Sequence, residues 1–349
     1  MSEKKSNSEK QSGFSFYVGT YTYENSEGIY KYLLRSDGSL EKIGLVAKAE
    51  NPSFLAKQKE TNVLVAVNEL EQGRVESYVI QEDTLVLTSQ ESSGGSYPCH
   101  ITISPTDHVL AANYGSGTVG VHKLNADGVL SELLHVQEHQ GSGDTDRQKG
   151  PHAHSVWIED NNNIISADLG TNELWFSRIL ADDKLVYAEP SRLNLAPDSG
   201  PRHLAMHQNG KWLYVLNELS STITWVEQVE GNYIKKQSIS MLPTDFTESS
   251  SGADIHLSSD GRFLYASNRG HNSIVIYEVD HTEGSLTLIG FEGTRGKTPR
   301  NFALSPDERF LVVANQDSST IVSFERNAQN GTLQFVNQIE APTPVCILF

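Results

Sequence analysis

The chain has 349 residues, enough for a large core, and carries 27 Lys and Arg against 44 Asp and Glu, a formal charge of −17. This acidic balance argues against nucleic acid and anionic membranes as partners, because both bind basic surfaces. Two cysteines, Cys99 and Cys346, are too few for a disulfide framework, and no apolar run reaches the length of a membrane-spanning helix.

The first predicted element in chain order is a tail. Residues 1–13, MSEKKSNSEKQSG, are polar and lack the apolar segment of a secretion signal. They predict a short disordered tail on a cytoplasmic protein. The remainder, residues 14–349, is expected to be a single domain, and its first stretch, FYVGTYTYENSEGIYKYLL, predicts two strands.

A unit of about 50 residues then recurs along the chain. Each unit has a Pro or Gly, a short alternating strand, a turn, a second strand ending in a small polar residue, and a third strand. The turns include Asn209-Gly210 and Asp260-Gly261, as hairpins require. The intervals between unit starts are 46, 53, 50, 51 and 47 residues, and the starts are Pro52, Pro98, Pro151, Pro201, Gly252 and Pro299.

A seventh unit is split between the two ends of the chain. The segment 344–349, PVCILF, matches only a first strand, and the N-terminal stretch matches only a second and a third strand. Joining them predicts an all-β fold: a seven-bladed β-propeller with four-stranded blades, closed by pairing of the C-terminal strand with the N-terminal blade. The alternatives are a sandwich, which would not explain the split unit, and a β-helix, whose coils are much shorter than this period.

The repeat also predicts which side chains share one mouth of the central channel. First strands line that channel, so residues just after each unit start and at the end of each second strand are expected to converge there. Arg202, Arg269 and Arg300 occupy such positions, and three converging arginines in an acidic protein predict an anion site. The Asn that recurs at second-strand ends, as at Asn268, favours a scaffold role, because Asn side chains bond the backbone of turns.

A metal site is the competing interpretation. His152 and His154 lie two positions apart and, with Glu218 and Asp254, could supply nitrogen and oxygen ligands. Neighbouring arginines repel a cation, and hard cations prefer several carboxylates. We therefore expect neither a metal nor another cofactor.

Several stretches, in this order, resemble the lactonase family of seven-bladed propellers. They are FYVGTYT, GSG followed by RQ, PHAHSV, PRHLAMH, YVLNE, SGADIHLSSDGRFLYASNRG and PRNFALSPD, and the resemblance covers roughly residues 14–349. This family includes the bacterial propeller-type 6-phosphogluconolactonases, and the chain is more distantly similar to carboxy-cis,cis-muconate cyclases. The resemblance implies a hydrolase of 6-phosphogluconolactone in the pentose phosphate pathway, with a small anionic lactone as its partner.

The resemblance also implies a catalytic set: His154 in PHAHS, Arg202 in PRH, Glu218 in LNE and Arg269 in SNRG. We expect His154 to act as general base or acid and Glu218 to position it or the water. The two arginines would bind the oxyanion or an acidic substituent. The candidates for substrate binding are His100, His152, His203, Asn268, Lys297, Arg300 and Asn301.

Two other function classes stay open from the sequence. One is a lactonising cyclase acting on a carboxymuconate, in which the same arginines would hold carboxylates. The other is a non-catalytic propeller scaffold, although the WD and GH signatures of the commonest scaffold repeats do not occur. Assaying the purified protein with each substrate distinguishes the two enzymes.

Overall fold

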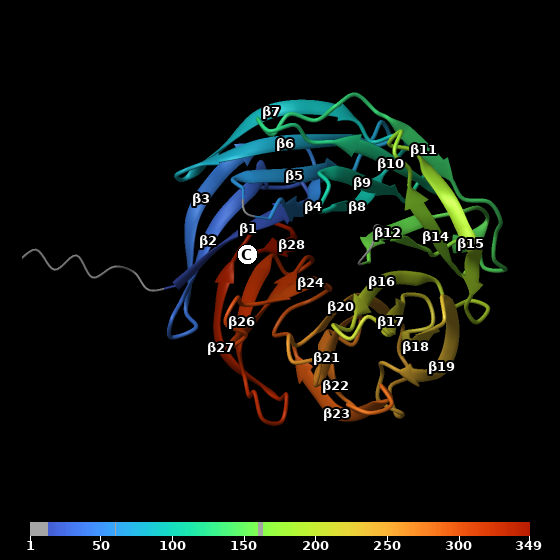
Figure 1. The fold of residues 1–349 in the computed structure, drawn as a ribbon. Helices are drawn as coiled ribbons and strands as arrows, with labels where there is room; N and C mark the ends of the chain where they lie inside the picture. Colours follow the sequence, from blue (N-terminus) through green and yellow to red (C-terminus); the bar gives the residue numbers. More distant parts are fainter. Residues whose placement is uncertain (1–12, 60, 160–162) are drawn as a thin grey trace, which may run out of the picture.

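The computed structural model describes residues 13–59, 61–159 and 163–349. The predicted tail falls, in residues 1–12, outside this part, and strand β1 begins at Gly13. The described residues form seven four-stranded antiparallel sheets arranged in a ring (Figure 1), which confirms the seven-bladed β-propeller. No helix among them is long and apolar enough to cross a membrane.

Seven strands, one from each sheet, line the centre of the ring (Figure 1). They are β28 (Pro344–Leu348), β4 (Pro52–Lys57), β8 (Pro98–Ile103), β12 (Ala153–Ile158), β16 (Pro201–Met206), β20 (Ser251–Leu257) and β24 (Pro299–Leu304). Each contacts the next one around the ring, and the contacts of β28 with β24 and β4 complete the circle. These are the first strands that the repeat predicts.

The other strands follow outward in each sheet. The second strands are β1 (Gly13–Thr20), β5 (Val63–Asn68), β9 (His108–Asn113), β13 (Asn163–Asp168), β17 (Trp212–Asn217), β21 (Phe263–Arg269) and β25 (Phe310–Asn315). The third strands are β2 (Gly28–Arg35), β6 (Arg74–Gln81), β10 (Thr118–Lys123), β14 (Glu173–Ile179), β18 (Thr222–Val229), β22 (Ser273–Val279) and β26 (Thr320–Arg326). The outer strands are β3 (Leu40–Lys48), β7 (Thr84–Ser92), β11 (His135–Glu138), β15 (Leu185–Asn194), β19 (Asn232–Ser240), β23 (Leu286–Gly293) and β27 (Leu333–Glu340).

The hydrophobic core consists of layers between neighbouring blades. Second strands such as β5 and β25 are buried at every position, and their sequences, VLVAVN and FLVVAN, are nearly continuous apolar runs. One layer packs Tyr265 of β21 against Phe302 of β24 and Phe324 of β26. The outer strand β19 instead has only exposed and half-buried residues, because only one of its faces is covered.

The ring closes through the two ends of the chain. Strand β28 pairs antiparallel with β1, with Tyr17 opposite Leu348 and Gly19 opposite Cys346, so that the first sheet has the order β28-β1-β2-β3. This is the closure that the split unit predicts. It leaves no open edge between the first and last sheets.

Candidate active site

A β-bulge near the start of each innermost strand supplies the first group of site residues. In β16, Pro201 pairs with Asn217, and pairing resumes at His203 with Leu216. Arg202 is therefore the extra, unpaired residue, and a bulge re-aims such a side chain. The bulge residues at the equivalent positions of five strands are Ser53, Cys99, His154, Arg202 and Arg300.

The ends of the second strands supply the other group. Glu218 directly follows β17, and its backbone N–H bonds the carbonyl oxygen of Gly200 at 2.7 Å, which ties this position to the connection from the previous blade. Glu69 makes the equivalent bond to Asn51 at 3.0 Å. Because the two strands are antiparallel, the start of the innermost strand lies beside the end of the second strand, so both groups of side chains converge on one mouth of the channel. The residues at the position equivalent to Glu218 in five blades are Tyr21, Glu69, Tyr114, Glu218 and Arg269.

The carboxylate of Glu218 is the centre of the site and is almost fully buried. Its Oε2 accepts a hydrogen bond from Arg202 Nε at 3.0 Å and forms an ion pair with Arg269 Nη2 at 2.9 Å, while Arg269 Nη2 donates to the carbonyl oxygen of Gly252. Its Oε1 accepts one from Arg147 Nη2 at 3.1 Å. His154 Nε2 lies 3.8 Å from Oε2. The structure thus brings together the four predicted catalytic residues and adds a third arginine.

The charges of these groups fix their protonation states. Burial by itself raises the pKa of Glu218, but the positive charges of Arg269 and Arg202 outweigh it and lower this pKa to about 2. Burial and the charge of Arg202 hold the pKa of His154 well below its usual range. Near neutral pH the carboxylate is therefore ionised and the imidazole neutral. The neutral imidazole has a ring nitrogen that can accept a proton, and its lowered pKa makes it a weak base.

His154 is held from its other side by Cys99, the bulge residue of the neighbouring strand. The sulfur lies 3.6 Å from His154 Nδ1 and its S–H donates to the backbone oxygen of His154 at 3.3 Å. Burial raises the pKa of the Cys99 thiol, so the group is a neutral packing partner. This contact leaves His154 Nε2 facing the Glu218 side of the mouth.

Arg300 forms the opposite wall of the site. Its guanidinium lies over the ring of Tyr21, 5.3 Å from the centroid, and its Nη2 is 3.8 Å from Glu69 Oε2. The Tyr21 hydroxyl donates to the same carboxylate oxygen at 2.8 Å. The ion pair of Arg300 is longer than the arginine ion pairs of Glu218. We therefore expect its guanidinium to be bound less tightly by the protein.

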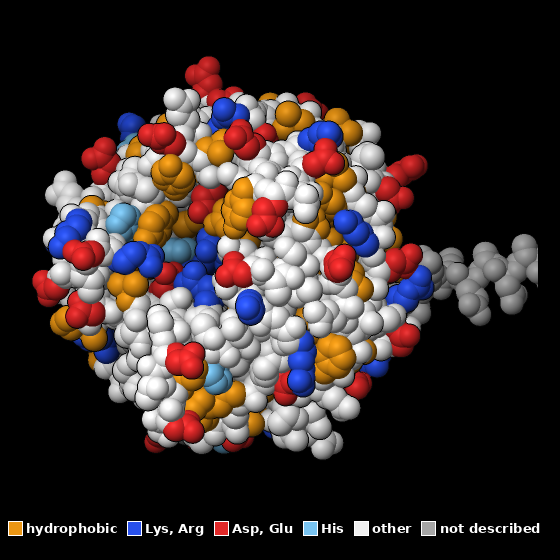
Figure 2. Space-filling model, turned by 180° about the vertical axis from the view of Figure 1, so that it is seen from behind, with side chains coloured by type: hydrophobic (Ala, Val, Ile, Leu, Met, Phe, Trp, Pro, Cys, Tyr) orange, Lys and Arg blue, Asp and Glu red, His pale blue; other side chains and the backbone are white. Residues whose placement is uncertain are grey.

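The mouth is positively charged within an acidic protein. Four arginines and two glutamates belong to the network, so four minus two gives a local charge of +2. The face drawn in Figure 2 is hollowed near the middle of the ring, and blue, pale-blue and red side chains gather there. Because a cleft with a net positive charge concentrates anions, this arrangement favours an anionic ligand.

Besides Arg300, three of the predicted substrate-binding residues lie at or directly behind the mouth. His152 is half-buried and stacks on Tyr114 with ring centroids 4.4 Å apart. His203 and Asn301 lie deeper, and their polar atoms already have partners. His203 bonds Asp254 through Nδ1 at 2.7 Å and faces Arg202 through Nε2 at 3.2 Å.

The other predictions for substrate binding place residues away from the mouth. Asn268 is fully buried and donates to the carbonyl of Met241 at 2.7 Å, so the structure places its side chain inside the blade and not at the mouth. His100 is 3% exposed, and its ring packs at a tilt of 34° against Phe54 inside the channel. Lys297 is exposed on the loop before β24 and does not belong to the ion-pair network among the described residues.

Arg147 is the site residue that the sequence did not predict. It comes from the connection between β11 and β12, which includes the short 3-10 helix Asp146–Gln148. Gln148 fixes this connection by donating to the carbonyl of Leu169 and to Asn172 Oδ1, both at 2.7 Å. Arg147 also donates to the Tyr114 hydroxyl at 2.9 Å. The RQ of the sequence motif was the available signal, but the loop lies outside the repeat pattern.

The possible metal ligands are not assembled as the sequence alternative requires. Asp254 bonds His203 and His256, at 2.7 and 2.9 Å, whereas Glu218 bonds arginines. In residues 13–59, 61–159 and 163–349, no group of three or more His, Cys, Asp or Glu is placed to hold a metal ion. The donor set of this mouth suits an anion.

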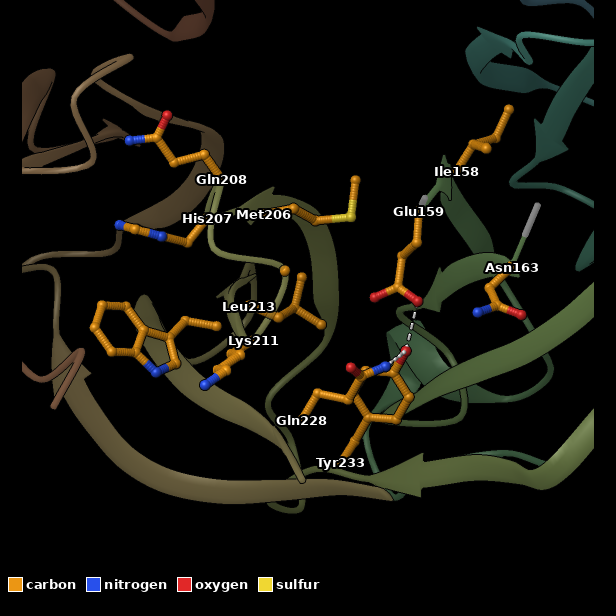
Figure 3. Close-up of a pocket in the computed structure, with 12 residues that line it drawn as sticks. Ile158, Glu159, Asn163, Met206, His207, Gln208, Lys211, Leu213, Gln228 and Tyr233 are labelled. Atoms are coloured by element: carbon orange, nitrogen blue, oxygen red, sulfur yellow. Dashed lines mark hydrogen bonds between the residues drawn. The ribbon is translucent and has the colours of Figure 1, made fainter. Parts of the chain in front are cut away.

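A separate pocket of about 400 Å³ lies away from this network (Figure 3). Ile158 and Met206, the last residues of β12 and β16, line it, so it is at the opposite ends of these strands from the bulges. Figure 3 shows Glu159 pointing to the Tyr233 hydroxyl, which donates to it at 2.6 Å. Because the lining contains none of the arginines at the channel mouth, this pocket is not part of the candidate site.

Replacing Glu218 by glutamine is expected to destabilise the fold at neutral pH by about 3–5 kcal/mol, because Arg202, 2% exposed, loses the negative charge that compensates its burial. The folded-state pKa of Glu218, about 2, lies below its ordinary value of 4.5. Its stabilising contribution is therefore fully present above about pH 4.5 and is lost as the pH falls toward 2. Urea unfolding should show that the free-energy difference between wild type and variant decreases as the pH is lowered from about 4.5 toward 2.

The surface variant Glu325→Gln is the control, because its ion pair with Arg309 is exposed and 4.0 Å long. We expect it to change the unfolding free energy by less than about 1 kcal/mol. A Glu218→Gln variant as stable as this control at pH 7 would contradict the electrostatic description of the site.

Comparisons with known proteins agree with the seven-bladed fold. The sequence matches the family model described as "Lactonase, 7-bladed beta-propeller" over residues 15–349. It is 36% identical over 293 residues to 6-phosphogluconolactonase of Bacillus subtilis (strain 168), covering 82% of this chain and 83% of that protein. The structure is similar to the periplasmic gluconolactonase of Pseudomonas aeruginosa, with a TM-score of 0.92, 32% identity and coverage of 96% and 98%. A Lactobacillus plantarum protein gives a TM-score of 0.92, 31% identity and coverage of 97% and 99%.

Proposed function

This chain belongs to the lactonase family of seven-bladed β-propellers, and on that premise we propose that it hydrolyses 6-phospho-D-glucono-1,5-lactone to 6-phosphogluconate. The observation that carries the proposal is the local charge of +2 at the channel mouth beside a neutral, buried imidazole. The first suits a phosphorylated anion, and the second supplies a proton acceptor. The similarity to a 6-phosphogluconolactonase supports the same substrate.

The chemistry we propose uses the residues around Glu218. His154 Nε2 accepts a proton from water as the water oxygen bonds to the lactone carbonyl carbon. Arg202 and Arg269 stabilise the oxyanion that forms on the carbonyl oxygen. The bond from the carbonyl carbon to the ring oxygen then breaks, and His154 returns its proton to that oxygen. Glu218, which stays ionised, holds the two guanidinium groups in place.

Binding of the substrate also changes the pKa of His154. In the empty site, burial and the charge of Arg202 keep the imidazole neutral but weakly basic. An anion bound against the arginines offsets their positive potential and raises the pKa of His154 toward the range that suits proton transfer. On this proposal, a phosphorylated lactone promotes its own hydrolysis better than an uncharged one does.

Arg300 and Arg147 are the groups that we assign to the phosphate. Arg147 is about half exposed, and Arg300 has the longest ion pair of the four. Guanidinium groups bind phosphate through paired N–H donors. The assignment leaves Arg202 and Arg269, which share one oxygen of Glu218, for the reacting carbonyl.

We expect Arg300→Met to raise KM for 6-phosphogluconolactone about 10- to 100-fold, since a charge-assisted contact to the phosphate is lost. The effect on glucono-1,5-lactone, which has no phosphate, should be several-fold smaller. The measurement is the initial rate with each lactone, corrected for spontaneous hydrolysis. Wild-type protein without any lactonase activity would refute the proposed reaction, whereas an equal effect on both lactones would refute only the phosphate assignment.

The same proposal places the protein in the cytoplasm and requires no metal or other cofactor. Rates that persist after treatment with a chelator, together with fractionation of cells that express the tagged protein, test these two points. The Pseudomonas aeruginosa relative is described as periplasmic, so the fold itself does not decide the compartment.

A further inference from the structure

Asp254 is a buried carboxylate behind the channel mouth whose two oxygens are fully used by the protein. Its Oδ1 accepts from His203 Nδ1 at 2.7 Å and from the backbone N–H of Ile255 at 3.0 Å. Its Oδ2 accepts from Asn301 Nδ2 at 2.6 Å and from His256 Nε2 at 2.9 Å. The carboxylate is 2% exposed, so it reaches the reacting groups only through its neighbours.

These contacts determine the tautomer of His203. A carboxylate can only accept and a guanidinium can only donate. Nδ1 of His203, facing Asp254, must therefore carry the hydrogen, and Nε2, 3.2 Å from Arg202 Nη1, must present its lone pair. Burial and the charge of Arg202 lower the pKa of His203 to about 4, which agrees with a neutral ring.

Arg202 is consequently fixed on three sides. Its Nε donates to Glu218 at 3.0 Å, and its Nη1 donates to His203 and to the carbonyl oxygen of Ala253. Among the residues that the structure describes, Nη2 has no hydrogen-bond partner. Its N–H groups are the ones left for a ligand.

We propose that Asp254 and His203 are positioning residues: Asp254 holds His203 as the Nδ1–H tautomer, and the lone pair on Nε2 orients Arg202 so that Nη2 meets the oxyanion. The inference rests on the proposed lactone hydrolysis and assigns His203 a place behind the arginine instead of a contact with phosphate. In the opposite tautomer, the Nε2–H of His203 would face an N–H of Arg202, and this clash of donors would displace the guanidinium.

Two substitutions of His203 separate this role from packing. The amide oxygen of glutamine reaches the position of Nε2 and can accept from Arg202, whereas asparagine reaches only the position of Nδ1. We expect His203→Asn to lower kcat about 10- to 100-fold with KM for the lactone changed less than about threefold. His203→Gln should retain kcat within about fivefold of wild type. Asp254→Asn should lower kcat about as much as His203→Asn does. In a protein that already carries His203→Gln, the same Asp254→Asn substitution should lower kcat much less.

His108 provides the matched control. It is also a buried histidine bonded to an aspartate at 2.7 Å, Asp183, but it lies at the start of β9, away from the arginines. Its glutamine and asparagine variants should differ in kcat by less than about twofold. If the two His203 variants are equally active or equally impaired while folded, the positioning role is wrong.

The tautomer itself can be measured without any substrate. Nitrogen-15 NMR of the imidazole groups, with the His203 signals identified by their loss in His203→Gln, should show the neutral Nδ1–H form in wild type and a change of tautomer in Asp254→Asn. An Nε2–H form or an imidazolium in wild type at pH 7 would overturn the inference. Wild-type protein that hydrolyses no lactone would count against the proposed function, and the NMR result would still decide on the Asp254–His203 arrangement.

Discussion

Replacing Arg202 by lysine is expected to lower kcat/KM for the lactone about 10²–10³-fold while the propeller stays folded. The guanidinium of Arg202 bonds Glu218 through Nε and His203 through Nη1, and we assign Nη2, which has no hydrogen-bond partner in the described part of the chain, to the substrate. An ammonium group is a single point donor and cannot keep these three directions at once. The measurement is steady-state kinetics, with far-UV circular dichroism to verify the fold.

The control for this prediction is Arg192→Lys. Arg192 pairs with Glu173 at 3.4 Å on an outer part of the β12–β15 blade and is about half exposed. Its substitution should leave kcat/KM within about twofold of wild type. Arg202→Lys protein that is folded and as active as this control would show that Arg202 does not contact the transition state.

Deleting residues 344–349 is expected to prevent the protein from folding. This segment is the innermost strand of the first sheet, and it buries Val345, Cys346 and Ile347 against β1, β4 and β24. Fully burying an aliphatic side chain of this kind contributes about 1.5–3 kcal/mol, so the loss approaches the whole stability of a typical domain. The deletion also exposes the edge of β1. Soluble yield and urea unfolding measure the effect.

Deleting only Phe349 is the matched control, because it removes one ring that packs on Phe16 at a centroid distance of 5.1 Å. That variant should fold with reduced stability. Adding a peptide of residues 342–349 should restore structure to the longer deletion, since the strand can pair with β1 from outside the chain. A soluble, cooperatively unfolding protein without residues 344–349 would contradict closure of the ring by β28.

The fold could be predicted from the sequence because the repeat controls it. Seven copies of one strand pattern, including the split copy, leave few ways to bury both faces of the second strands. The same repetition placed His154 and Arg202 near first-strand starts, and Glu218 and Arg269 at second-strand ends. Periodicity therefore predicted the ring and the end of the channel where these side chains meet, and the resemblance to the lactonase family selected the four residues as a catalytic set.

The rest of the site depends on irregular features that periodicity does not encode. Arg147 reaches Glu218 only because a non-repeating loop is fixed by Gln148. The bulges that single out Arg202 and Arg300 from their neighbours are one-residue shifts of register. Asn268 stands beside Arg269 in the sequence, but strand alternation directs its side chain into the blade, away from the mouth.

The most direct test of the central claim, that the channel mouth around Glu218 is a lactone hydrolysis site, is a crystal structure with bound 6-phosphogluconate. We predict that the carboxylate of this product contacts Arg202 and Arg269 within hydrogen-bond distance of His154, and that its phosphate contacts Arg300 or Arg147. Product bound only in the pocket of Figure 3, or absent from the mouth at saturating concentration, would contradict the account.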